Sequence, residues 1–373
     1  MTAIRPALLL VLLLAACTPR GAIVVDPAAA EVGTVRPVFV GTSRGKDEET
    51  GTEYARLRNP DTRFARFDIA IPPAHQPGRI TYTRPDRAPD PQTDFLTTRE
   101  IVYDEPGAFR ADLARALRQT PRGSREAVVF VHGFNTTFAE GLYRIAQLSH
   151  DLKMPGVAVH YAWPSRWAPL AYAYDRDSAL FARDGLEDLL DEVTAAGAER
   201  VVLVGHSMGA AVTMETLRQM AIAGKPLRNI AGVVLISPDL DVDLFRAQAD
   251  RIGDLPQPFV IFTSKRDRVL ALSARVSGET ARLGNVTDVA LLSGLDVTLI
   301  DVTSYSTGTG HFTPGTSPAL IGILSQISEV DDALASGQIG QTGLLPGVVL
   351  TVQGATQIVM SPVTALAGGL DGQ

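Results

Sequence analysis

The sequence has a single cysteine, Cys17, among its 373 residues, and this scarcity excludes several classes of protein. One cysteine cannot form a disulfide within the chain, and it cannot supply a zinc site built from several cysteines. The metalloprotease pattern H-E-x-x-H is also absent. We therefore expect no disulfide framework, no metal and no cofactor.

Positive charge is also in short supply. The chain has 34 Lys and Arg against 41 Asp and Glu, a net charge of -7, and contains no dense basic run. Nucleic-acid-binding proteins usually carry a basic patch or have a high pI, so we expect no nucleic-acid partner. A hydrophobic fraction of 45% and a charged fraction of 20% are typical of a globular chain.

The N-terminus reads as a processing segment. Arg5 supplies a positive charge, and residues 8–14 form an apolar run that is too short to span a membrane. The run ends in Leu-Ala-Ala-Cys at Cys17, which resembles the lipobox of bacterial lipoproteins. An ordinary secretory signal with an incidental cysteine is the alternative. We expect a signal peptide over residues 1–16 and a lipidated Cys17 with a tether over 17–35, placing the protein in the envelope at the outer membrane facing the periplasm.

Hydrophobic patterning divides the rest of the chain into three parts. Residues 36–104 predict a β-rich extension, with strands at 38–41 and 66–71 and a possible third at 80–83. Residues 105–334 alternate continuous apolar strands with helices, which is typical of a parallel sheet covered on both faces. The expected strands lie at 127–131, 157–161, 201–204, 230–236, 258–262 and 297–302, and the expected helices at 108–117, 138–152, 176–196 and 208–223. Residues 335–373 form an apolar, glycine-interrupted tail, which we expect to be mobile or to lie on the surface.

The strongest motif is Gly-His-Ser-Met-Gly at residues 205–209, here called the elbow. It follows an apolar strand and precedes a helix, and this context makes a common pentapeptide specific. A tight strand-to-helix turn would expose the Oγ of Ser207 above the sheet, beside the positive end of the helix. The motif predicts that Ser207 is a nucleophile in an α/β-hydrolase fold.

A second motif, His132-Gly133-Phe134-Asn135, directly follows the predicted strand at 127–131. An α/β-hydrolase places one of its oxyanion donors at this position, and the other on the residue after the nucleophile. We therefore expect the backbone N–H groups of Phe134 and Met208 to form the oxyanion hole, with His132 holding the loop. A simple His-Gly turn is the alternative.

The base and the acid follow from chain order, which in this fold is serine, then acid, then histidine. Among the six histidines only His311 lies after Ser207, so elimination selects it as the base. Asp267 occupies the usual acid loop and is the preferred acid. Asp239 is the runner-up, and Asp241 and Asp301 also follow strands.

Residues 36–330 resemble a family of bacterial α/β-hydrolases described as esterase-like or lipase-like proteins of unassigned function. The resemblance is carried by residues 129–135, Trp163-Pro164-Ser165, Asp175 with Ser178, the elbow, and Ser237 to Asp241. It implies hydrolysis of an ester-like bond in a small-molecule or lipid substrate, and it supplies no particular substrate. A lipase, thioesterase, acyltransferase or peptidase would use the same residues, and an inactive envelope scaffold is the non-enzyme alternative. Residues 163–174 are either a cover that shapes an acyl pocket or a packed surface loop.

Overall fold

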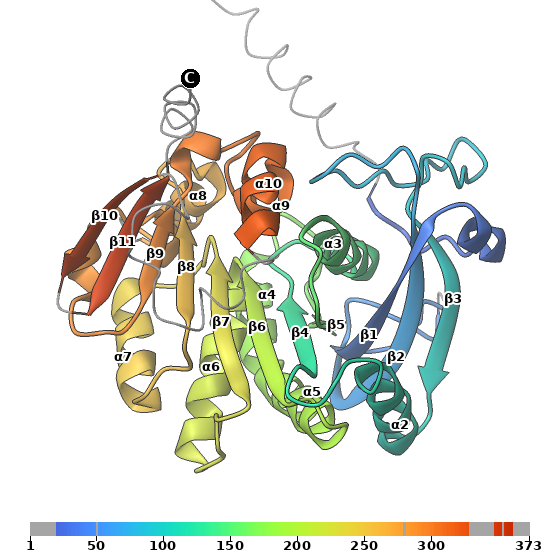
Figure 1. Cartoon of the computed structure of the whole chain (residues 1–373), viewed down its shortest axis with the longest axis horizontal. Coiled ribbons are helices and arrows are strands. Elements are labelled where there is room, and N and C mark those ends of the chain that lie inside the picture. Colours follow the sequence, from blue (N-terminus) through green and yellow to red (C-terminus); the bar gives the residue numbers. More distant parts are fainter. Residues whose placement is uncertain (1–19, 50, 279–280, 328–346, 353, 361–373) are drawn as a thin grey trace, which may run out of the picture.

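The computed structural model describes residues 20–49, 51–278, 281–327, 347–352 and 354–360. In these residues one sheet runs across the molecule, in the order β10-β11-β9-β8-β7-β6-β4-β5-β1-β2-β3 (Figure 1). Its strands are β1 (Thr34–Arg44), β2 (Arg58–Ile71), β3 (Leu96–Tyr103), β4 (Glu126–Val131), β5 (Val157–Ala162), β6 (Arg200–His206), β7 (Ile230–Ile236), β8 (Phe259–Thr263), β9 (Thr298–Asp301), β10 (Gly347–Val352) and β11 (Ala355–Met360).

Helices connect most of the parallel strands. They are α2 (Pro106–Leu117), α3 (Phe138–Asp151), α4 (Tyr172–Phe181), α5 (Arg183–Ala195), α6 (Met208–Ile222), α7 (Val242–Ile252), α8 (Arg268–Val276), α9 (Thr313–Thr316) and α10 (Pro318–Ile327). Short 3-10 turns are η1 (Pro27–Glu31), η2 (Leu283–Asn285), η3 (Val289–Leu292) and η4 (Thr303–Tyr305). None of the helices in this described part is long and apolar enough to cross a bilayer.

Successive side chains of a strand point to opposite faces of the sheet, and helices cover both faces of the central strands. Along β4, Val129 and Val131 join the core cluster that contains α2, α5, α6 and α7, whereas Phe130 joins the cluster that contains α3. Leu320 of α10 packs with the ends of β7, β8 and β9 in a third cluster, and Ile323 and Leu324 of the same helix pack against it. The prediction of a mostly parallel sheet with helices on both faces is confirmed.

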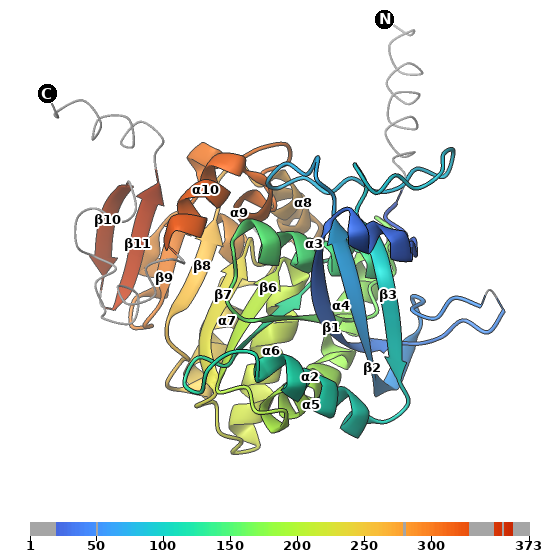
Figure 2. The same cartoon turned by 45° about the vertical axis from the view of Figure 1, so that its right-hand side comes forward.

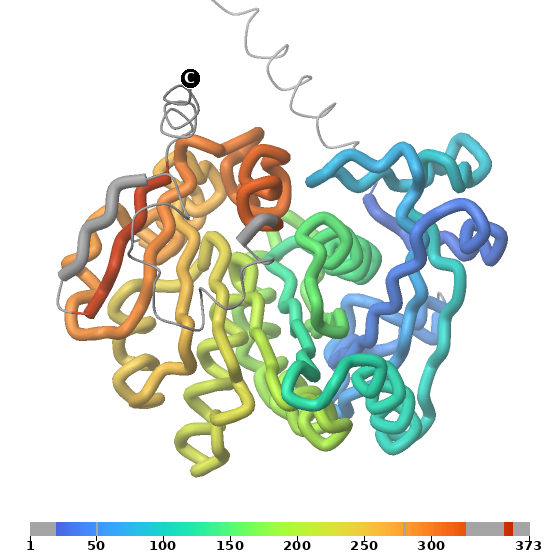
Figure 3. Tube along the Cα trace, in the orientation of Figure 1, coloured from blue at the N-terminus to red at the C-terminus, as the bar shows by residue number. Residues whose placement is uncertain are grey.

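The N-terminal extension is part of this sheet. Strand β1 pairs in parallel with β5, so a blue and a green stretch of the chain meet in the sheet (Figure 3). About 120 residues separate hydrogen-bonded partners such as Thr42 and Ala162. Strands β2 and β3 continue the sheet antiparallel, as the predicted β-rich extension requires. The expected strand at 80–83 is wrong, because one backbone hydrogen bond, from Phe95 N to Thr81 O, does not make a strand pair. The third strand is β3 instead.

The expected helix over 176–196 is in fact two helices, α4 and α5. They meet at Ala182, whose carbonyl accepts a hydrogen bond of 2.5 Å from the Tyr161 hydroxyl on β5. The apolar spacing is continuous across this junction, so periodicity alone does not reveal the break.

Residues 20–35 do not form the expected free tether. Val25 forms a bridge with Thr97 of β3, and Asp26 caps the 3-10 turn η1 by accepting from Ala28 N at 3.0 Å. Figure 2 shows this segment packed beside the antiparallel strands. The predicted lipidation site, Cys17, lies outside the described residues.

The prediction of a mobile or surface-lying tail is also wrong for residues 347–352 and 355–360. Strands β10 and β11 form a hairpin in which Gly354 has a φ of 90°, and β11 pairs in parallel with β9. An apolar strand pair at the end of the sheet buries its backbone polar groups in ladder bonds, which a loose tail would leave to water.

Candidate active site

Ser207 lies at the sharp turn between β6 and α6. Its backbone has φ 53° and ψ -122°, a conformation that costs a non-glycine residue about 1–3 kcal/mol. The turn is held by the bond from Ser207 N to Ile236 O, at 3.0 Å. Such strain is retained where the surrounding structure fixes it, and it is typical of functional positions.

Two glycines allow this turn to pack against its neighbours. A Cβ on Gly209 would lie 2.3 Å from Val131 O and 2.4 Å from His132 O, so the first turn of α6 touches the end of β4 directly. A Cβ on Gly205 would lie 2.8 Å from Ala210 Cα. Only glycine fits at either position, because the obstructing atoms are backbone.

The loop that follows β4, residues 132–137, is here called the oxyanion loop. It lies against the elbow, since a Cβ on Gly133 would be 2.9 Å from Ser207 Cβ. In the part of the chain that the structure describes, no hydrogen bond occupies the backbone N–H of Phe134 or that of Met208. These two groups therefore remain available to an oxygen that forms beside Ser207.

His311 and Asp267 are brought together across two loops. The Nδ1 atom of His311 lies 2.8 Å from Oδ2 of Asp267, and the side chain of Asp267 is fully buried. The other carboxylate oxygen, Oδ1, accepts from Val269 N at 3.0 Å and from Leu270 N at 2.9 Å, which caps α8. Each oxygen of Asp267 thus has a separate task, one fixing the carboxylate on a helix and the other orienting the imidazole.

Asp239, the runner-up acid, occupies a different position. Its carboxylate accepts from Ser273 Oγ at 2.6 Å and from Tyr172 Oη at 3.0 Å, and it forms an ion pair of 3.2 Å with Arg282. Its backbone N–H donates to Ser207 O at 3.1 Å. Asp239 therefore supports the elbow from behind, and its carboxylate is taken up by groups other than His311.

The remaining aspartates that follow strands have local roles. Asp301 accepts from Thr303 N at 2.9 Å, and Asp241 caps α7 by accepting from Leu244 N at 2.8 Å. In the described residues neither is bonded to His311. The same residues contain no group of three or more His, Cys, Asp and Glu arranged to hold a metal ion.

His206, the second residue of the elbow, connects Ser207 to His311. Its Nε2 lies 3.3 Å from His311 O, and the two imidazole rings are 4.8 Å apart. Burial, with a smaller contribution from His311, lowers the pKa of His206 well below its ordinary value, so the ring is neutral near pH 7. A neutral ring with its proton on Nε2 donates to the His311 carbonyl, which places the His311 backbone next to the elbow.

His132, the first residue of the oxyanion loop, packs against Trp163. Their rings stack at 5.0 Å, and Trp163 Nε1 donates to His132 O at 2.6 Å. The ring nitrogens of His132 lie 2.9 Å from Gly133 O and 3.1 Å from Trp163 O. Burial lowers the pKa of His132 well below its ordinary value, which fits the structural role expected for this residue.

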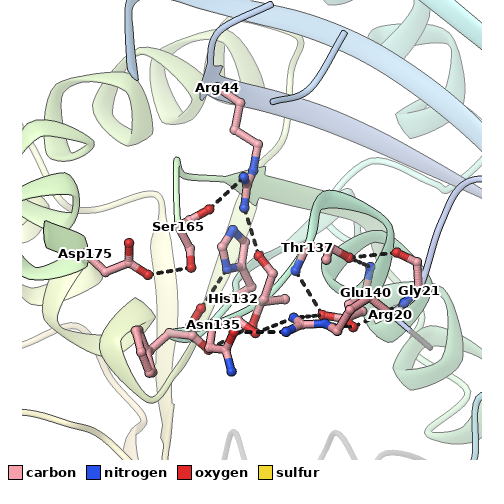
Figure 4. Close-up of polar contacts among 12 residues, drawn as sticks. Arg20, Gly21, Arg44, His132, Asn135, Thr137, Glu140, Ser165 and Asp175 are labelled. Atoms are coloured by element: carbon pink, nitrogen blue, oxygen red, sulfur yellow. Dashed lines mark hydrogen bonds and ion pairs between the residues drawn. The ribbon is translucent and has the colours of Figure 1, made fainter. Parts of the chain in front are cut away.

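Arg44, on β1, supports the oxyanion loop and was not identified from the sequence. The fully buried side chain donates to Thr136 O at 3.0 Å and to Ser165 O at 3.0 Å (Figure 4). Burial lowers the pKa of Arg44 to about 9, so the guanidinium remains charged at neutral pH. Asp175 fixes Ser165 in turn, by accepting from its hydroxyl at 2.6 Å.

Arg20, in the N-terminal segment, holds the same loop through a second set of bonds. Its guanidinium donates to Glu140 with Nε at 2.8 Å and Nη2 at 2.6 Å, and to Asn135 with Nη1 at 2.9 Å to Oδ1 and Nη2 at 2.6 Å to the carbonyl (Figure 4). Asn135 has a positive φ of 54°, directly after Phe134. No local motif marks Arg20, because its partners lie 115 and 120 residues away.

The ends of the segment 163–174 are packed, and its expected role as a cover that shapes an acyl pocket stays a prediction. Trp163 is buried, and Tyr172 bonds Asp239 and makes an edge contact with Phe134 at 5.4 Å. Leu170 is fully exposed. The ends of the segment therefore pack on the site while its middle faces solvent.

The parallel sheet, the strained serine after β6 and the histidine and buried aspartate on later loops together define an α/β-hydrolase. Residues 105–318 match the family described as alpha/beta hydrolase of unknown function (DUF900), and the chain belongs to this family. No protein with a curated description matches it.

Solved structures of esterases are similar at low identity. A thermostable esterase from Pseudomonas putida is 16% identical with a TM-score of 0.34, covering 62% of this chain and 90% of its own. An esterase from Pyrobaculum calidifontis is 15% identical with a TM-score of 0.34, covering 62% and 94%. An ester-hydrolase from the metagenome of Lake Arreo is 13% identical with a TM-score of 0.34, covering 80% and 82%.

Proposed function

We propose that the protein is a serine hydrolase that cleaves a carboxylic ester through an acyl-enzyme on Ser207. The observation that carries the proposal is the bond of 2.8 Å between His311 Nδ1 and the buried Asp267. The strained Ser207 is close to this pair, because its neighbour His206 lies 3.3 Å from the His311 carbonyl oxygen. A hydroxyl is a weak nucleophile at neutral pH, and a positioned imidazole activates it by taking its proton.

The proposed reaction assigns a step to each of these residues. His311 Nε2 takes the hydroxyl proton as Ser207 Oγ attacks the ester carbonyl. The oxygen of the tetrahedral intermediate accepts from the N–H groups of Phe134 and Met208, and losing one such donor typically costs about 10²–10³ in kcat. Protonated His311 gives its proton to the leaving alcohol, the intermediate collapses to the acyl-enzyme, and water activated by His311 then releases the acid.

A fluorophosphonate probe tests the nucleophile, because it reacts with an activated serine. We expect the wild type to be labelled, Ser207→Ala to be unlabelled, and His311→Ala to be labelled far more slowly. Equal labelling of wild type and Ser207→Ala would contradict Ser207 as the nucleophile. No labelling of either would contradict the hydrolase and support the inactive scaffold.

Hydrolysis of p-nitrophenyl esters of increasing chain length then measures the acyl preference. Thioester substrates and added alcohol acceptors distinguish the thioesterase and acyltransferase alternatives, which would use the same three side chains. Faster turnover of a thioester, or a transfer product in place of the free acid, would replace ester hydrolysis as the activity.

We also propose that Cys17 is lipidated and anchors the protein to the bacterial envelope, at the outer membrane facing the periplasm. The support is the apolar run that ends at the chain's single cysteine. Cys17→Ser should move the protein from the membrane fraction to the soluble fraction. Unchanged membrane association of this variant would count against the lipid as the sole anchor.

A further inference from the structure

A cavity of about 310 Å³ opens beside the elbow. Gly133 and His206 form its wall on the side of the site, and both adjoin Ser207: Gly133 through the close approach to Ser207 Cβ, His206 through the peptide bond. Phe130 and Phe312 supply apolar walls, and Arg144 and Glu140 supply the charges. A ligand bound at Ser207 therefore has a pocket next to it that contains both apolar surface and charge.

Glu140 is already occupied by groups of the protein. Its Oε1 accepts from Arg20 Nε and from Gly21 N, and its Oε2 accepts from Arg20 Nη2 and from Thr137 N at 2.9 Å (Figure 4). Four donors satisfy the carboxylate, so its charge is neutralised by Arg20.

Arg144, unlike Glu140, forms no ion pair in the described part of the chain. Its Nη1 donates to Gln147 Oε1 at 2.8 Å and to Gly315 O at 3.3 Å, and its guanidinium lies 5.1 Å from the centre of the Phe312 ring. The nearby Asp151 is used by other donors, including Gln147 Nε2 and Gly78 N. Burial lowers the pKa of Arg144, as expected for a cation that is desolvated without a carboxylate partner.

We propose that this cavity is a subsite for a carboxylate carried by the ester that Ser207 attacks, with Arg144 as the residue that binds it. Arg144, which has no ion-pair partner among the described residues, matches the charge of one carboxylate, and its planar fork matches the geometry of that group. The phenylalanine walls suit the carbon chain between this carboxylate and the ester. The preferred substrates are then esters with a second, anionic end, in the acyl or the alcohol part.

This proposal rests on the proposed function, and a ratio of rates tests it separately. The p-nitrophenyl hemiester of adipic acid and p-nitrophenyl hexanoate have acyl chains of equal length and differ in a terminal carboxylate. Phenyl acetate and 4-acetoxybenzoate make the same comparison on the alcohol side. A hydrogen-bonded charge pair is worth roughly 1.5–3 kcal/mol, so Arg144→Met should lower the anionic-to-neutral ratio of kcat/KM by about 10-fold to 100-fold in at least one pair.

Two further variants control the comparison. Arg228→Met removes the same charge from an exposed position of the surface and should keep the wild-type ratio. Arg144→Lys retains the charge without the planar fork and should give an intermediate ratio. Equal ratios in wild type and Arg144→Met, or the same fall in Arg228→Met, would overturn the proposal while leaving ester hydrolysis intact.

Calorimetric titration with adipate measures the subsite without turnover. We expect Arg144→Met to bind adipate at least about tenfold more weakly than the wild type, in protein shown by urea unfolding to be folded. If neither ester of either pair is hydrolysed, the proposed function fails, and the titration still decides whether Arg144 binds a carboxylate. Equal adipate affinities would reject the subsite.

Discussion

Replacing Asp267 with Asn changes one atom of a side chain that makes two kinds of contact. The amide oxygen can still accept from Val269 N and Leu270 N and so keep the cap of α8. The amide NH₂ then faces His311 Nδ1, where Asp267 Oδ2 lies at 2.8 Å. A donor at this position forces Nδ1 to accept and places the imidazole proton on Nε2, which is the wrong tautomer for a base.

The expected cost to activity is large and the expected cost to stability is small. In a serine hydrolase the corresponding substitution lowers kcat by about 10⁴, which corresponds to about 5.4 kcal/mol of transition-state stabilisation. Because the cap is retained, the free energy of unfolding should change by less than about 1 kcal/mol in Asp267→Asn. Asp267→Ala should lose the cap as well, at a further cost of about 0.5–2 kcal/mol.

Hydrolysis of p-nitrophenyl butyrate and urea unfolding measure the two quantities, and Asp239→Asn is the matched control. Asp239→Asn disturbs the bonds to Ser273 and Arg282, so it should reduce stability and lower kcat by less than about tenfold. If Asp267→Asn keeps more than a tenth of the wild-type kcat, or if Asp239→Asn loses as much while remaining as stable, another group orients His311 and the acid assignment is incorrect.

Two further predictions concern the packing and titration of the core around the site. Gly209→Ala should destabilise the protein by about 1–3 kcal/mol in urea unfolding, because the added Cβ would lie 2.3 Å from Val131 O. Gly107→Ala is the control, since a Cβ there has nothing within 4 Å, and it should change the free energy of unfolding little. Equal stabilities of the two variants would refute the close approach of Gly209 to β4. Burial lowers the pKa of His160 to about 3, so between pH 6.5 and 3 the unfolded chain binds one more proton than the folded chain, and stability falls as the pH falls through this window. His160→Gln removes this titration, so its free energy of unfolding should fall less steeply with falling pH, by up to about 1.4 kcal/mol per pH unit. Urea unfolding at pH 7.5, 5.5 and 4.5 measures the slope, and equal slopes for wild type and His160→Gln would contradict the lowered pKa.

The central part of the fold could be predicted because its signals are local. Each buried strand is a short apolar run, and the elbow lies between a strand and a helix that together occupy residues 200–222. The choice of His311 needed only the order of residues along the chain, and the structure places it beside Asp267. These roles in catalysis stay predictions until the variants are assayed.

What the sequence did not reveal depends on contacts between distant segments. Arg44 reaches Thr136 across 92 residues and Arg20 reaches Glu140 across 120, and an isolated arginine in a sequence has no periodicity or spacing that identifies its partner. Strands β10 and β11 were missed for a similar reason. Their glycine-interrupted, uncharged sequence resembles a tail until β9 supplies a ladder for β11.

The contact of Arg20 with the oxyanion loop also sets how the molecule would sit on a bilayer. Arg20 lies three positions after Cys17, and three extended residues span at most about 10–11 Å. With the proposed lipid on Cys17, the loop that carries Phe134 would face the headgroups at close range, and substrates would arrive from the bilayer surface. A protease cutting just after Arg20 would detach the protein and remove the bonds to Asn135 and Glu140 in the same event. Release from the membrane and loosening of the site would then be one step.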